Sequence, residues 1–338
     1  MHNFTSLFRA INRKDKLRIG SFSTHEAIQA EIAKTGHQFI HIKESPENKQ
    51  WNDEYRKRPR NIIEISFDQF KSSSGVDILI SNTISQQQFM GQLAKAFNLP
   101  HITFLYCYHP ENWSNYTMEN IKVYEKSDYM VFLTEDQRKE WRCEGRDNCF
   151  VINHAIDNEF FKPREDNGVK THILTVANFY KERNSELNYT LYEEIKQKCP
   201  QYSYLHLGSS SNGEYKPAKD VNELVDSYTK SKVFINTCHR SVIPTTVLEA
   251  MSCGVPVLST SNPTLEKLIK HGENGYLFST AEEAEEILNI LHSDEENYKK
   301  ISENARQTII NQYNIEKSNA AWNELFNKVL IKHEKRIF

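Results

Sequence analysis

Two threonines and a glutamate in one short stretch are residue types that can bind a phosphorylated ligand. Pro244 suits the first position of a helix, because its missing N–H would have no partner there anyway. Thr245 and Thr246 would then open the helix with free N–H groups, which attract phosphate together with the helix dipole. Glu249 follows on the same helical face. The spacing predicts a nucleotide site, with the diphosphate at the helix start and the ribose hydroxyls on the carboxylate.

The elements that position these residues lie within Ser241–Thr260, which predicts a short loop, a helix of about three turns, a tight turn and a buried strand. Gly254 ends the predicted helix, and residues 255–258 begin the strand. The residues alone leave an alternative open. The stretch could be an ordinary helix–strand unit of an α/β domain, with Glu249 in water.

The stretch EAMSCGVPVLST, continued by HGENGYLF at 271–278, resembles the donor-site signature of GT-B glycosyltransferases, specifically the retaining family 4 type, also called glycosyl transferases group 1. The resemblance implies an α/β protein with two Rossmann-like, doubly wound domains that face a central cleft. It implies transfer of a sugar from a nucleotide diphosphate sugar, UDP- or GDP-linked, to an acceptor hydroxyl of a glycan, glycolipid or other glycoconjugate. It also implies retention at the anomeric carbon and no need for a metal ion or cofactor.

The order of predicted elements agrees with two such domains. Leu17–Phe22 predicts a first strand, residues 27–35 a helix and residues 38–42 a second strand, which is the βαβ opening of a parallel sheet. We expect an acceptor domain over residues 1–164, a nucleotide-sugar domain over 165–313 and, at 314–338, a helix that packs back on the first domain. The resemblance implies this crossing.

The resemblance also assigns cations to the donor diphosphate, but this chain departs from the family there. Asn178 falls where the family has an arginine, and Arg183 falls where it has a lysine. An asparagine brings no charge, so Lys181 and Arg183 are expected to neutralise the diphosphate. The alternative interpretation of this segment is a polar loop.

A second departure concerns the donor sugar. Family 4 enzymes carry two glutamates eight positions apart, and the resemblance places the second, which contacts the ribose, at Glu249. The first, which contacts the sugar, falls on Ser241. A serine hydroxyl makes a hydrogen bond but carries no negative charge. Sugar recognition is therefore expected to differ, or Glu266, His239 or Arg240 compensates, or activity is weak.

Two further candidates lie in the first domain. His109 follows a strand predicted from Pro100 to Tyr108, at the sheet edge where α/β proteins bind their ligands. The resemblance implies that His109 faces the donor sugar and orients hydroxyls, although a histidine there can equally be structural. Gly20 stands alone where the family has a glycine-rich loop, so we expect a less close approach of backbone to ligand.

Composition limits the partners. The 338 residues carry a net charge of −3, which gives no overall field that favours nucleic acid. The chain shows no apolar run of membrane-spanning length and no signal peptide, and its six scattered cysteines predict reduced thiols in a cytoplasm. Residues 1–16 predict a basic amphipathic helix. It either docks on the protein, which we favour, or lies on the cytoplasmic face of a membrane. The oligomeric state is not predicted.

Two rival functions remain on the same fold. One is a catalytically silent GT-B-like subunit that binds a partner or a nucleotide, which Ser241, Asn178 and the glycine-poor first loop suggest. The other is a sugar-nucleotide epimerase, which would need carboxylates or acid–base pairs in the first domain, and no convincing set is present. Binding of nucleotide sugars without turnover would favour the silent subunit.

Overall fold

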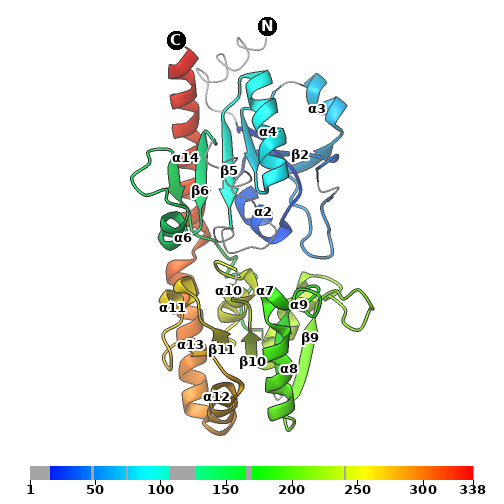
Figure 1. Ribbon diagram of the computed structural model, residues 1–338, viewed down its shortest axis with the longest axis vertical. Helices are drawn as coiled ribbons and strands as arrows, with labels where there is room; N and C mark the ends of the chain where they lie inside the picture. Colours follow the sequence, from blue (N-terminus) through cyan, green and yellow to red (C-terminus); the bar gives the residue numbers. More distant parts are fainter. Residues whose placement is uncertain are drawn as a thin grey trace. The chain divides into compact units, whose positions relative to one another are not determined.

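The computed structural model describes residues 16–46, 49–73, 75–106, 127–164, 170–239 and 241–337. The chain divides into two compact units. The first comprises Met1–His154 with Glu316–Phe338, and the second comprises Ala155–Ile315. The expected boundary after residue 164 thus differs from the observed division, which gives the segment that follows His154 to the second unit. Figure 1 shows the elements of both units.

The first unit is built on a seven-stranded parallel sheet in the order β3-β2-β1-β4-β5-β6-β7. Its strands are β1 (Arg18–Ser21), β2 (Gln38–Ile42), β3 (Ile62–Ile65), β4 (Ile78–Ser81), β5 (His101–Leu105), β6 (Tyr129–Phe132) and β7 (Cys149–Val151). Its helices are α2 (Glu26–Ala33), α3 (Phe67–Ser73), α4 (Ile84–Phe97), α6 (Glu135–Glu140) and α14 (Ile315–Ile337), the last starting one residue earlier, in the second unit. The chain runs outward from β1 to β3 and then returns to β4 beside β1, so the winding reverses between β1 and β4.

The second unit has a five-stranded parallel sheet in the order β12-β11-β10-β8-β9. Its strands are β8 (His172–Val176), β9 (Ser203–Leu207), β10 (Ser231–Asn236), β11 (Val257–Thr260) and β12 (Tyr276–Phe278). Its helices are α7 (Asn184–Leu187), α8 (Tyr189–Lys198), α9 (Val221–Lys230), α10 (Thr245–Ser252), α11 (Pro263–Leu268), α12 (Ala281–Ser293) and α13 (Glu295–Gln312). Here the winding reverses between β8 and β10. The expected α/β fold with two doubly wound parallel sheets is confirmed.

Helix α14 packs on the first unit through one apolar face. Trp322 and Phe326 are almost fully buried, and the Trp322 ring meets Phe104 of β5 edge-on with 5.2 Å between ring centroids. Farther along, His333 hydrogen-bonds the carbonyl oxygen of Asn98 at 3.0 Å. In Figure 1 α14 is the red helix beside β6. Each large apolar side chain buried here stabilises the unit by about 1.5–3 kcal/mol.

Candidate functional site

The residues expected to bind the donor gather where the winding of the second sheet reverses. Residues 177–183 follow β8, and residues 237–244 follow the neighbouring strand β10 and lead into α10. Parallel strands end at the same sheet edge, and a reversal of winding leaves a crevice there in which α/β proteins bind ligands. The reversal of winding between β8 and β10 thus has one candidate segment on each side. Lys181 and Arg183 belong to the segment after β8, and Ser241 belongs to the segment after β10.

The start of α10 presents two backbone donors. Pro244 has φ −64° and ψ 128° and is the N-cap residue, one position before its expected place in the first turn. In the described part of the chain, no side chain caps this helix end, and the N–H groups of Thr245 and Thr246 have no acceptor. Both threonines are half-buried. The helix therefore offers an oriented pair of donors and the positive end of its dipole to an anion.

Glu249 lies one turn behind these donors and is held in place from α9. The Tyr228 hydroxyl donates a hydrogen bond to Glu249 Oε2 at 3.0 Å. Glu249 is only 2% exposed, so the alternative of a solvated side chain is wrong. Sequence reasoning missed Tyr228, because nothing in the spacing of the two residues indicates that α9 and α10 meet. A buried, oriented carboxylate is suited to accept hydrogen bonds from a polyol with little cost of reorganisation.

The segment after β8 is tied to the segment after β9. Asn178 Oδ1 accepts a hydrogen bond from the Ser209 N–H at 2.9 Å. Gly208 makes this contact possible, because a Cβ atom there would lie 1.8 Å from the carbonyl oxygen of Ala177. The asparagine that stands in place of the family's arginine thus joins two loops.

The two expected cations are available at the surface. Lys181 is exposed. The Arg183 guanidinium contacts Glu186 at 2.7 Å, and both side chains are nearly half exposed. An exposed pair of this kind contributes at most about 1 kcal/mol, so an incoming phosphate can displace the carboxylate.

Among the described residues, the hydrogen bond to Ser241 comes from an asparagine and not from a carboxylate. The carbonyl oxygen of Ser241 accepts a hydrogen bond from Asn262 Nδ2 at 3.1 Å. Glu266 accepts a short hydrogen bond from Ser261 and is exposed, as is His239. Arg240 lies outside the described residues.

Two residues of the first unit, His109 and Gly20, are also candidates for the site. His109 lies outside the described residues. Gly20 lies inside β1, and a Cβ there would come within 2.7 Å of the Leu79 side chain and 3.1 Å of Val76. The lack of a side chain at Gly20 is thus accounted for by core packing. The polar segment that follows β1 is formed by Ser23, Thr24 and His25, beyond Gly20.

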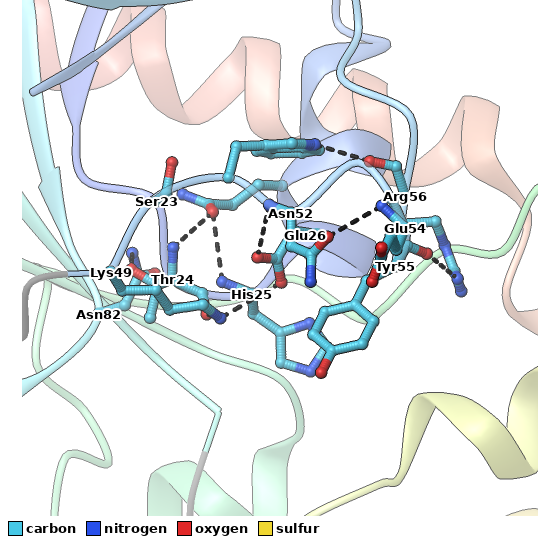
Figure 2. Close-up of polar contacts among 12 residues, drawn as sticks. Ser23, Thr24, His25, Glu26, Lys49, Asn52, Glu54, Tyr55, Arg56 and Asn82 are labelled. Carbon is cyan, nitrogen blue, oxygen red and sulfur yellow. Dashed lines mark hydrogen bonds and ion pairs between the residues drawn. The ribbon is translucent and has the colours of Figure 1, made fainter. Parts of the chain in front are cut away.

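Figure 2 shows a polar cluster around this segment that sequence reasoning missed. Glu26, which is 4% exposed, pairs with Lys49 Nζ at 3.2 Å and accepts the N–H of Asn52 at 3.2 Å. The Asn82 side-chain amide lies 3.4 Å from the Thr24 hydroxyl, which links the ends of β1 and β4. These groups lie where the winding of the first sheet reverses. The sequence signal that could have indicated this cluster is the polar run SFSTHE, which follows an apolar strand.

Buried histidines make the first unit sensitive to acid. Burial lowers the pKa of His41 and His154 to about 3 and that of His101 to about 4. His25 also falls to a pKa of about 4, through burial and then the charges of Lys49 and Arg56. Each of these imidazoles is neutral in the folded protein at a pH where the unfolded chain is already protonated.

We therefore expect the stability of the first unit to fall as the pH drops below 6.5 and to keep falling toward pH 4. Each histidine contributes up to about 1.4 kcal/mol per pH unit in that window, because the unfolded chain binds the proton that the folded chain resists. Urea unfolding at pH 7.0, 6.0 and 5.0 measures the effect. His101→Gln should flatten the dependence, and equal stability at all three pH values would contradict the expectation.

No helix among the described residues is long and apolar enough to cross a membrane. These residues also contain no group of three or more His, Cys, Asp or Glu side chains that could hold a metal ion.

Comparison with known proteins agrees with the geometry of the second unit. Residues 164–308 match the family model described as glycosyl transferases group 1. This segment contains Lys181, Arg183, α10 and Glu249. The family match therefore lies in the second unit and includes every donor-site candidate of that unit.

Curated relatives are distant. A probable sucrose-phosphate synthase of Thermosipho melanesiensis is 24% identical over 55% of this chain and 51% of its own length. An uncharacterized glycosyltransferase of Haemophilus influenzae is 24% identical over 58% of this chain and 60% of its own length. The match thus spans little more than half of each relative.

Solved structures resemble the whole chain. The Anabaena protein Alr3699/HepE, crystallised in complex with UDP and glucose, superposes with a TM-score of 0.73 at 14% identity, over 92% of this chain and 99% of that one. Sucrose-phosphate synthase from Thermosynechococcus elongatus gives a TM-score of 0.70 at 14% identity, over 94% of this chain and 100% of that one. At these identities the likeness shows the fold, and the fold is GT-B.

Proposed function

We propose that the protein is a retaining glycosyltransferase that moves a sugar from a nucleotide diphosphate sugar to an acceptor hydroxyl. One observation carries the proposal. The amides of Thr245 and Thr246, which have no acceptor among the described residues, lie one turn ahead of the buried Glu249, at the reversal of winding in the sheet that matches the glycosyltransferase family. This arrangement suits a diphosphate joined to a ribose.

In this proposal the anomeric C–O bond to the diphosphate breaks and a new C–O bond to the acceptor oxygen forms on the same face of the sugar. The acceptor proton leaves with the diphosphate. Negative charge builds on the departing diphosphate, so preorganised donors there lower the barrier most. The amides of α10, Lys181 and Arg183 supply that stabilisation, Glu249 anchors the ribose, and His109 orients the reacting sugar.

The donor is proposed to be UDP- or GDP-linked. The UDP complexes of the Anabaena structure support UDP as the first choice. The acceptor is proposed to be a glycan or lipid-linked molecule bound by the first unit. The cytoplasm, with contact at its membrane face, is the proposed location, and the basic segment at residues 1–16 that suggests this contact lies outside the described residues except for Lys16.

A second candidate is a GT-B subunit that binds nucleotide without turnover. Ser241 in place of a carboxylate and the use of Asn178 to join two loops favour it.

A panel of UDP- and GDP-sugars separates the two functions. With the native protein we expect slow hydrolysis that releases nucleoside diphosphate from one donor, measured by a coupled assay. Glu249→Gln serves as the control for contaminating hydrolases. Binding by calorimetry without any release would favour the silent subunit, and neither binding nor release with any donor would contradict both.

A further inference from the structure

Phe179 is an exposed aromatic residue in an unusual backbone conformation. Its side chain is 42% exposed, and the other large hydrophobic residues that stand exposed in the described part of the chain are Ile290 and Ile331. Its φ is +54°, in the left-handed region. Bulky residues seldom adopt this region, because Cβ crowds the backbone. Strain of this kind is concentrated at functional sites, where the surrounding structure enforces it.

The surroundings of Phe179 fix its backbone on both sides. The Phe179 N–H donates to the carbonyl oxygen of Ser209 at 2.6 Å, and the Arg183 N–H donates to the carbonyl oxygen of Phe179 at 2.8 Å. The neighbouring Asn178 side chain also bonds Ser209. The ring is thus held at the carboxyl end of β8 without being packed away from solvent.

We propose that the phenyl ring of Phe179 stacks on the nucleobase of the donor. This inference rests on the proposed function. A phenyl ring has no hydrogen-bonding atom, so it suits the flat face of a base better than a sugar rich in hydroxyls. Nucleobases stack on aromatic side chains whatever their identity, since every base presents a π-face.

The sheet order favours the base end of the donor over the sugar end. Phe179 is bonded to Ser209, in the segment that follows β9, on one side of β8. Ser241, the residue expected to face the sugar, follows β10 on the other side of β8. A diphosphate centred on the start of α10 separates the two ends of the donor. The sugar end then points to Ser241, which leaves the base end for Phe179.

Phe179→Gly tests the proposal, because glycine accepts the left-handed conformation and removes only the ring. We expect the affinities for UDP and for UDP-glucose to fall by the same factor, about 5- to 150-fold. This is the usual contribution of one stacked base to binding. The melting temperature should be unchanged or higher. Phe179→Tyr, which keeps a ring, should restore binding. Arg142→Gly is the matched control, since Arg142 is an exposed residue of the first unit with φ +53°.

Each other outcome has a distinct meaning. Unchanged UDP binding by Phe179→Gly would overturn the stacking proposal. A loss confined to UDP-glucose would also overturn it, since the ring would then contact the sugar. Lost binding together with a lower melting temperature would show a structural ring and overturn it too. If the native protein binds neither UDP nor GDP, the proposed function fails first, and the stacking proposal fails with it.

Discussion

Glu249→Gln is expected to bind UDP about 10- to 150-fold more weakly than the native protein, because a hydrogen bond to a charged group is worth about 1.5–3 kcal/mol. The substitution keeps the volume and the acceptor oxygen that Tyr228 needs, but removes the negative charge offered to the ribose hydroxyls. Isothermal titration with UDP measures the effect. The loss should be the same for UDP-glucose, because the ribose is common to both.

Tyr228→Phe separates the role of Glu249 in binding the ligand from the role of Tyr228 in holding Glu249 in place. It removes the hydroxyl that holds Glu249 but leaves the charge in place. We expect a stability loss of about 1–3 kcal/mol, because a buried carboxylate loses a donor. Its effect on UDP affinity should be smaller than that of Glu249→Gln. Native affinity in Glu249→Gln would remove Glu249 from the donor site, whatever the behaviour of Tyr228→Phe.

Gly208→Ala is expected to cost about 3 kcal/mol or more of the stability of the second unit, because its new Cβ would overlap a backbone oxygen that cannot move alone. The overlapping atom is the Ala177 carbonyl oxygen, 1.8 Å away. Relief requires the segment after β8 to separate from the segment after β9. The Asn178–Ser209 hydrogen bond is then lost, and UDP binding should fall with it.

Gly213→Ala is the matched control in the same loop. Gly213 has φ +71° and no atom within 4 Å of its would-be Cβ, so only local strain of about 1–2 kcal/mol is expected. Thermal unfolding and UDP titration of both variants provide the comparison. Equal losses in the two variants would contradict the role assigned to the contact between residues 177 and 208.

The elements of the second unit could be predicted from the sequence because each is indicated by residues close together in the chain. The strand predicted to begin at residues 255–258 is observed as β11, and α10 begins at Thr245, within one residue of the position indicated by Pro244. The resemblance across 249–278 pointed to the same family as the match over residues 164–308. Local pattern and tertiary context agree in this region.

The remaining features depend on contacts between distant residues. The hydrogen bond from Tyr228 to Glu249 requires α9 to pack near α10, and no periodicity shows this. The buried position of Gly20 follows from the side chains of β4 and α3 that fill its place. The strand β3 and helix α3 were not predicted, since their short segments follow a long polar stretch.

Helix α14 makes the first unit discontinuous in sequence. The chain leaves this unit at His154 and returns to it at Glu316. During synthesis, the seven-stranded sheet emerges first, yet the face that Trp322 and Phe326 cover stays open until α14 has left the ribosome. The second unit is a single uninterrupted segment and can complete its core earlier. The first unit can therefore be completed only after the second has been synthesised, and a nascent chain halted before residue 316 presents an incomplete first unit to chaperones.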